Sequence, residues 1–487
     1  MCIRDRLKCS VNEHIRPLAL DMCNLQKFCR FMPHEPDNNA RPAEPDNARP
    51  ASPSTNSPTS RYRVLSVRGD VGVKELLDSE MLGKDIRLRS LLYFGTGKMQ
   101  REELKVSFKR VRNQLSLAPR IYRLLRTLEL QGARLDSLPS SIRCLVCLRY
   151  LGLRNTQLED LPESLDMLTK LLCLDIRDTN ITSLYDVSTF REMRHLHLAK
   201  SFRGQSVLIG GGLRSLVHLR TLSGAADGGN LERELSHLVF LRKLSIKVSS
   251  ASSNNICAAV SNMGFLHSLA ITVHDDEPAK AKGNTSEGGE PLEEKGNIAD
   301  GEHEPLEKKQ ETPDRKRFDI GSLKIGENMR KLKLGGDMGE LSAARISMMH
   351  SITHLYLWDS KLDSDVLRSL QGLQDLLQLS LCNVSTCSEL RCAQGGFRKL
   401  KKLSIVSMEN LNECILERGA MKNLEELMFA MSGKRTSSVQ GLEHILSLKN
   451  VYLSEMPTHF VDRVKATATR AQIHVNGMLF HKREEEE

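Results

Sequence analysis

One short segment of this chain resembles a nucleotide-binding loop. In Gly95-Thr96-Gly97-Lys98 the glycines and lysine are of the types that cradle phosphates with backbone amides and a cation. The segment lacks the first glycine at the required spacing, and it continues with Met99 rather than a magnesium-binding hydroxyl. We therefore interpret it as a turn that follows a strand, and we do not expect nucleotide hydrolysis.

Two other pairs of residues have types that bind metals. His195 and His197 lie two residues apart, and Cys144 is separated from Cys147 by two residues. A structural zinc site needs four ligands, and neither pair has further ligands at a suitable spacing. Acid, base or nucleophile groups that would converge in a pocket are not recognisable either. We expect no metal, no cofactor and no catalytic activity.

The elements that carry these residues follow from a spacing. The phrase L-x-x-L-x-L recurs at intervals close to 23 residues, which is typical of leucine-rich repeats. Two looser copies precede the array, Tyr62/Leu65/Val67 and Leu88/Leu91/Tyr93. Thirteen copies open at Leu125, Leu148, Leu171, Met193, Leu219, Leu241, Leu266, Met329, Ile352, Leu376, Leu400, Leu424 and Leu448.

This spacing predicts an α/β leucine-rich repeat solenoid, a curved horseshoe with parallel strands on the concave face and irregular or short helical segments on the convex face. Alternation in L-x-L sends two leucines to one side of a strand. One unit cannot cover its own leucines, so stacked units bury them in a continuous core. At roughly 4.8 Å per strand, thirteen strands would line a wall on the order of 60 Å long, which suits a protein partner.

Composition divides the chain further. We expect an unassigned leader at 1–32, a proline- and serine-rich disordered linker at 33–60, repeats at 61–274 and 318–475, and a charged tail at 476–487. Between the two blocks of repeats, the segment 275–317 holds 13 acidic and 8 basic residues and predicts a disordered insert. The formal net charge of the whole chain is +9, so the repeats are more basic than the total.

Apolar runs and cysteines indicate where the protein is located. No apolar run approaches the roughly 18 to 20 residues that span a bilayer. The 12 cysteines are scattered instead of flanking the array as paired caps. We expect a cytoplasmic protein with no membrane span.

The phrases L-L-R-T-L-E-L-Q-G-A-R-L-D-S-L-P-S-S-I and L-R-Y-L-G-L-R-N-T-Q-L-E-D-L-P-E-S-L carry a family resemblance. They resemble the leucine-rich repeat region of plant intracellular nucleotide-binding disease resistance proteins. The similarity covers about residues 61–475, whereas the nucleotide-binding domain of that family is not recognisable. We expect either a truncated receptor or a stand-alone repeat protein.

The resemblance implies a recognition module of an innate immune receptor. Such a module would sense a pathogen effector or a guarded host protein, and it would restrain a nucleotide-binding domain in cis or in trans. The alternative is a general scaffold, for example the substrate-recognition arm of a ubiquitin ligase. An F-box-like helical segment would identify that class, and residues 1–32 are too short and irregular to supply one.

Candidate binding residues occupy the exposed positions of the repeats. Eight of the thirteen second positions are basic, where chance predicts about two, and a basic column could steer an acidic protein surface to the wall. Arginine could equally suit this position because its stem covers apolar neighbours. The candidate second positions are Arg126, Arg149, Arg194, Arg220, Arg242, Arg330, Lys401 and Lys449, and the candidate third positions are His195, Lys331 and Lys402.

Aromatic residues near the same wall complete the candidate set. Tyr356, Trp358 and Tyr452 could anchor a protein partner, although ordinary packing would explain Trp358 equally well. Aromatic residues are only 4% of the chain, too few for base stacking, so nucleic acid is not an expected partner.

Overall fold

A computed structural model describes the protein over most of the repeats. The described residues are 29–31, 64–68, 89–94, 124–133, 135–199, 206–249, 253–274, 323–336, 341–360, 362, 364–384, 388–408, 410–430 and 438–475. The expected linker 33–60, the insert 275–317, the tail 476–487 and most of the leader 1–32 lie outside them.

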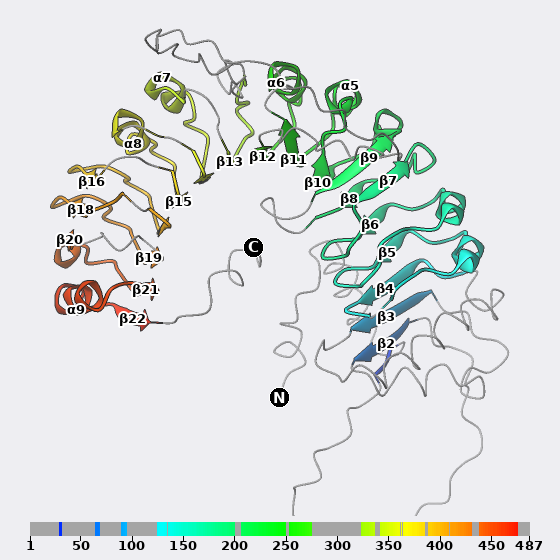
Figure 1. Cartoon of the computed structure of the whole chain (residues 1–487), viewed down its shortest axis with the longest axis horizontal. Helices are drawn as coiled ribbons and strands as arrows, with labels where there is room; N and C mark the ends of the chain where they lie inside the picture. Colours follow the sequence, from blue (N-terminus) through cyan, green and yellow to red (C-terminus); the bar gives the residue numbers. More distant parts are fainter. Residues whose placement is uncertain are drawn as a thin grey trace, which may run out of the picture.

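A single parallel sheet of 19 strands runs along the described chain and lines the inner side of an arch (Figure 1). Its strands are β1 (Cys29–Phe31), β2 (Val64–Arg68), β3 (Ser90–Phe94), β4 (Thr127–Gln131), β5 (Tyr150–Gly152), β6 (Cys173–Asp175), β7 (Ser183–Asp186), β8 (His195–His197), β9 (Val207–Gly211), β10 (Thr221–Ala226), β11 (Lys243–Ser249), β12 (Ser268–His274), β13 (Lys331–Gly335), β14 (His354–Trp358), β15 (Gln378–Cys382), β17 (Lys402–Val406), β19 (Glu426–Ala430), β21 (Asn450–Ser454) and β22 (Gln472–Val475).

The strands pair in chain order, with one branch. β6 pairs with β8 and β8 with β10, whereas β7 pairs with β9, which joins the end of β10. β1 lies in the leader, to which the sequence assigned no fold, and pairs with β2. The predicted α/β leucine-rich repeat solenoid is thereby confirmed.

Each of the thirteen predicted repeats enters its strand two residues after its opening apolar residue. The repeat that opens at Leu125 begins its strand at Thr127, and the repeat that opens at Leu448 begins its strand at Asn450. The looser copy at Leu88 follows the same rule with Ser90. The regularity arises because the opening leucine and the strand leucines must reach one core.

That core is a stack of leucines. Leu128 pairs in register with Leu151 and Leu151 with Leu174, and all three side chains are at most 1% exposed. Burying a leucine side chain contributes about 1.5–3 kcal/mol. Each repeat therefore depends on its two neighbours to bury its leucines, as expected for a solenoid.

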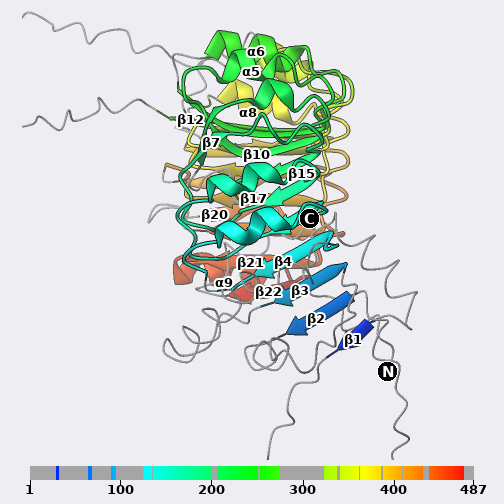
Figure 2. The same ribbon diagram turned by 90° about the vertical axis from the view of Figure 1, so that its right-hand side faces the viewer.

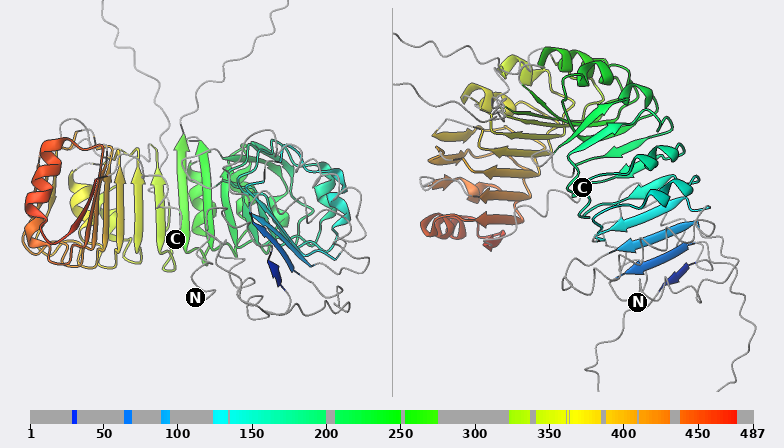
Figure 3. Two further views of the ribbon diagram at one scale, coloured as in Figure 1. Left: turned by 90° about the horizontal axis from the view of Figure 1, so that it is seen from below. Right: turned by 45° about the vertical axis from the view of Figure 1, so that its right-hand side comes forward.

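Short helices cover the outer side of the arch, as Figures 2 and 3 show for α5, α6, α8 and α9. The helices are η2 (Ser140–Cys144), η3 (Glu163–Met167), η4 (Leu213–Ser215), α5 (Leu231–Leu235), α6 (Ser253–Ser261), α7 (Ala343–Ser347), α8 (Ser364–Leu370), η7 (Leu442–His444) and α9 (Thr458–Thr467).

Two of these helices follow the Leu-Pro pairs of the sequence, Leu138-Pro139 and Leu161-Pro162. η2 and η3 each begin directly after a proline, Pro139 or Pro162, whose φ angles of −70° and −68° suit the residue that precedes a helix. The last helix, α9, packs Phe460 edge-on against Phe429 with 5.3 Å between ring centroids, which extends the core to the C-terminal repeats.

Three strands form a second, smaller parallel sheet on the outer side in the C-terminal half: β16 (Glu389–Cys392), β18 (Glu413–Leu416) and β20 (Ser438–Gln440). In these repeats the segment that leads from one inner strand back to the next repeat is itself a strand. The side chains of Leu390 and Cys414 face the core and are buried.

Candidate protein-interaction surface

The basic second positions form a row along the edge of the inner wall. The N–H of Arg149 donates to the carbonyl of Arg126, and the N–H of Arg242 donates to that of Arg220, each at 2.8 Å. Each lies one residue before its strand, so the row borders the wall that the third and fifth positions cover. All eight predicted basic second positions are exposed.

Charge divides this row into two parts. Arg126, Arg149, Arg194, Arg220 and Arg242 have no ion pair with any residue that the structure describes. We call these five residues the arginine row. Their positive charge is available to a partner.

The C-terminal part is largely neutralised by acidic residues of the same surface. Lys449 and Lys401 approach the Glu425 carboxylate at 2.6 and 3.4 Å, and Lys402 approaches Glu426 at 3.4 Å. The hydrogen bonds from Lys449 and then Lys401 lower the pKa of Glu425 from its usual value.

Sequence reasoning missed one member at the other end of the row. Arg126 and Thr127 donate their N–H groups to the carbonyl of Arg89 at 2.7 and 3.1 Å, and Arg89 is exposed. A signal was available, because Arg89 follows the opening Leu88 of a looser repeat.

Arg330 differs from the arginine row, although it is exposed too. Its guanidinium donates to the backbone carbonyls of Glu327, Met329 and Ser351 at 2.6, 3.3 and 3.3 Å. These bonds tie the side chain to its own turn and to the next one, which favours a structural role.

The inner wall beside the row holds a buried carboxyl group. Tyr150 donates a hydrogen bond to Glu129 Oε2 at 2.8 Å from the neighbouring strand. A Cβ atom at Gly152 would overlap the Glu129 carboxyl, so the glycine provides its space. Burial raises the pKa of Glu129 to about 7, against the opposing effect of the Tyr150 hydrogen bond.

An ion pair lies at the end of β6, between Asp175 and Arg177, which follows two residues later. Arg177 binds Asp175 through both guanidinium branches, with Nε at 2.9 Å from Oδ1 and Nη2 at 2.6 Å from Oδ2. Burial opposes ionisation of Asp175, but the hydrogen bonds and charge of Arg177 outweigh it, so the pKa of Asp175 is lowered. His197 also favours the charged form of Asp175.

The two wall histidines stack on one another. The rings of His195 and His197 are 6.2 Å apart between centroids and nearly parallel, at 4°. Nδ1 of His195 lies 3.1 Å from the Thr221 hydroxyl, and that of His197 lies 3.3 Å from the Ser223 hydroxyl. Over the described ranges no group of three or more His, Cys, Asp or Glu residues could hold a metal ion.

The predicted aromatic anchors are mostly covered. Tyr356 is 7% exposed, and the ammonium groups of Lys331 and Lys333 lie 5.3 and 4.6 Å from its ring centroid. Trp358 is 2% exposed and packs across Gly335, where a Cβ atom would overlap its indole. These exposures favour the packing role that the sequence left open for Trp358.

Tyr452, the remaining aromatic candidate, stacks on His474. Their ring centroids are 4.8 Å apart with 15° between the planes, and both side chains are half-buried. The predicted residues therefore do not form one cluster. The five row arginines precede strands between β4 and β11, whereas the aromatic residues lie on β14 and β21.

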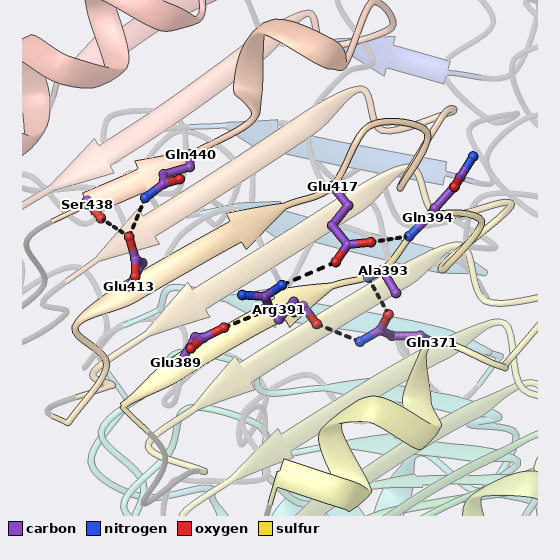
Figure 4. Close-up of polar contacts among 9 residues, drawn as sticks. All are labelled: Gln371, Glu389, Arg391, Ala393, Gln394, Glu413, Glu417, Ser438 and Gln440. Atoms are coloured by element: carbon purple, nitrogen blue, oxygen red, sulfur yellow. Dashed lines mark hydrogen bonds and ion pairs between the residues drawn. The ribbon is translucent and has the colours of Figure 1, made fainter.

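A polar network on the outer sheet was not anticipated (Figure 4). Arg391 on β16 pairs with Glu389 at 2.9 Å and with Glu417 at 3.5 Å, and Glu417 also accepts a hydrogen bond from the N–H of Gln394 at 3.0 Å. On the adjoining strands, Glu413 accepts hydrogen bonds from Ser438 and Gln440.

The three carboxylates of this network outnumber its one guanidinium, and its contacts join neighbouring strands of the outer sheet. The side-chain amide of Gln371 binds the backbone at the end of β16 (Figure 4). It donates to the Arg391 carbonyl and accepts from the N–H of Ala393. The sequence signal was the alternation of charged and apolar residues in Glu389-Leu390-Arg391-Cys392.

The cysteines are free thiols where the structure describes them. Cys144 and Cys147 are partly exposed, whereas Cys392 and Cys414 are buried. In the described part of the chain, none of the helices has the length and apolar character needed to cross a bilayer.

Comparisons with known proteins agree with this architecture. A family described as "Leucine-rich repeat region" matches residues 106–293 and 314–477. Disease resistance protein RPM1 of Arabidopsis thaliana is 30% identical over 148 residues, which are 30% of this chain and 16% of that protein. The probable disease resistance protein RXW24L of the same plant is 30% identical over 462 residues, 92% of this chain and 43% of that protein.

Among solved structures, an internalin from Listeria monocytogenes aligns with a TM-score of 0.41 and 15% identity, over 75% of this chain and 92% of the internalin. The chain spans less than half the length of the two curated relatives. Together the repeat spacing, the parallel sheet and the matched residues show that the chain belongs to the leucine-rich repeat region family and is of the type found in plant disease resistance proteins.

Proposed function

We propose that this chain is the protein-recognition module of a plant innate immune receptor that acts in the cytoplasm. It binds a pathogen effector or a guarded host protein, restrains a nucleotide-binding switch and performs no catalysis itself. The observation that carries the proposal is the arginine row, five exposed arginines with no ion pair among the described residues, beside the inner wall. The relatives favour this reading over the ubiquitin-ligase alternative.

Electrostatics explains how such a row would act. Unpaired arginines one to two strands apart create a positive potential along the edge of the wall, and they steer a partner that carries acidic residues there. Arginine also forms paired hydrogen bonds with carboxylates at little entropic cost. Lys401, Lys402 and Lys449, which pair with Glu425 and Glu426, would contribute much less to this potential.

The test is charge reversal in the full chain. The triple variant Arg194→Glu, Arg220→Glu and Arg242→Glu should lower affinity for the nucleotide-binding domain of a plant resistance receptor, supplied as a separate chain, and flatten the salt dependence of binding. Arg398→Glu, Arg418→Glu and Arg463→Glu together form the control, because they change the net charge equally at exposed sites away from the row. Equal affinity in both triple variants would reject the arginine row as the interface.

A further inference from the structure

The twelve repeats that open at Leu148 to Leu448 enter their strands through the same tight turn. The opening residue of the repeat donates its N–H to the carbonyl three residues earlier, as Leu219 does to Leu216 at 2.9 Å and Leu241 does to Leu238 at 3.2 Å. Apart from Gly326 in the turn before Met329, the first and last residues of these turns are buried and apolar, so the two middle residues face the surface. We call these two the turn corners.

Most turn corners are polar, as an exposed turn favours. Thr169-Lys170, Arg191-Glu192, Gln374-Asp375, Arg398-Lys399 and Lys422-Asn423 occupy the corners of five repeats and are exposed. The fold therefore accepts polar residues at these positions without loss of its core.

Apolar corners are concentrated in three consecutive repeats, whereas elsewhere in the described turns an exposed apolar corner residue occurs singly, as Val146 and Leu446 do. The corners of those three repeats carry Val217, Val239, Phe240 and Phe265, with exposed fractions of 45%, 42%, 52% and 51%. The two phenylalanine rings stack across adjacent turns, with 5.9 Å between centroids and 27° between planes. We call these four residues the phenylalanine patch.

Positive charge borders this patch on the side of the strands. Arg242 lies two residues after Phe240, and its N–H donates to the carbonyl of Arg220, while the N–H of His267 donates to the Arg242 carbonyl, both at 2.8 Å. Neither Arg220 nor Arg242 has an ion pair in the described ranges. Among the described turns, carboxylates occur at turn corners only outside the patch, at Glu192, Glu327 and Asp375.

Apolar aromatic residues framed by arginine are the composition that protein interfaces favour. Because Phe240 and Phe265 keep half of their surface in water and polar residues serve the same corners elsewhere, the fold itself does not require them. A partner that covers the rings would gain apolar burial, and its acidic residues would meet Arg220 and Arg242.

We propose that the phenylalanine patch, together with Arg220 and Arg242, is a docking site for a protein segment that carries acidic side chains beside an apolar one. The inference rests on the proposed recognition function and assigns it a place and a partner chemistry. Arg220 and Arg242 precede adjacent strands, about 4.8 Å apart, which suits a segment laid across the strands better than a plane of lipid headgroups.

The experiment measures binding of the full chain to three synthetic helical peptides. One presents glutamates beside leucines, the second replaces the leucines with serine, and the third replaces the glutamates with lysine. We expect only the first to bind measurably. Phe240→Asn with Phe265→Asn should weaken it at least about tenfold, and Arg220→Glu with Arg242→Glu should weaken it and reduce its salt dependence.

The design separates binding from folding. In two other repeats the equivalent corner position is already an asparagine, Asn328 or Asn423. The phenylalanine variants should therefore keep the thermal midpoint of the original chain. Leu446→Ser is the matched control, because Leu446 is a turn corner that is 69% exposed in a distant repeat. It should leave peptide affinity unchanged.

Other outcomes have definite meanings. Equal binding of the serine peptide, or no effect of the asparagine variants, would overturn the phenylalanine patch while leaving the arginine row intact. Binding to phosphatidylserine vesicles but not to any peptide would overturn it in favour of a membrane surface. If the row charge reversal also fails to affect the nucleotide-binding domain, the proposed function fails with it.

Discussion

The phenolic oxygen of Tyr150 lies 2.8 Å from Glu129 Oε2, so two neighbouring strands share a hydrogen bond on the inner wall. Both side chains are buried, and the other carboxylate oxygen, Oε1, has no hydrogen-bond partner among the residues that the structure describes. The carboxyl group is therefore held in a place that favours its neutral form, and its protonation should affect stability near neutral pH.

Replacing Glu129 with glutamine tests that expectation. Because the folded-state pKa is raised from 4.5 to about 7, the folded chain binds more protons than the unfolded chain between these values. The contribution of Glu129 is fully present below about pH 4.5 and is lost as pH rises through 7, by about 3 kcal/mol.

Glutamine imitates the neutral carboxyl at every pH. Thermal midpoints of the original chain and of Glu129→Gln should thus lie close together below about pH 4.5, diverge between about pH 4.5 and 7, and stay apart at higher pH, with the original chain less stable. Parallel midpoints over the whole range would show that the Glu129 carboxyl ionises as it does in water.

Gly152→Ala should destabilise the chain because the new Cβ atom would overlap the Glu129 carboxyl. We expect a cost of about 1–3 kcal/mol, measured by chemical unfolding. The cost should largely disappear in a Glu129→Ala background. Gly264→Ala serves as a control, since no atom lies within 4 Å of the added Cβ there. An undiminished cost in the double variant would place the clash elsewhere.

Arg177→Ala should destabilise the chain by about 3 kcal/mol, because it removes the guanidinium that binds the buried carboxylate of Asp175. The Asp175 side chain is 2% exposed, whereas in the pair of Arg154 with Asp178 the side chains are 20% and 32% exposed. Arg154→Ala should accordingly cost less than about 1 kcal/mol. Equal losses of unfolding free energy would contradict the assigned role of burial.

The cysteines should differ in their reactivity towards iodoacetamide. Burial raises the pKa of Cys414 to about 12, and burial raises that of Cys392 too, so both thiols are protonated and covered at neutral pH. Cys144 and Cys147 are partly exposed and should be labelled first. Peptide mass spectrometry under native conditions, with a denatured sample for comparison, would reveal the order, and early labelling of Cys414 would refute it.

The sequence by itself determined the repeat frame. The spacing of residues such as Leu125, Leu128 and Leu130 is enough, because a strand has a period of two and only one face can reach the core. All thirteen predicted copies consequently hold a strand at the expected register. The sequence also identified the exposed second positions, since the side chain that follows a buried leucine must point away from the core.

Tertiary structure decided which exposed residues have partners. Arg242 and Lys401 occupy the same repeat position, yet only Lys401 meets a carboxylate, which the next repeat supplies through Glu425. Trp358 is covered because Gly335 on the preceding strand leaves room for its indole. Phe240 and Phe265, 25 residues apart in the chain, stack only because adjacent turns align. Such contacts join one repeat to the next, and the period within a single repeat contains no information about them.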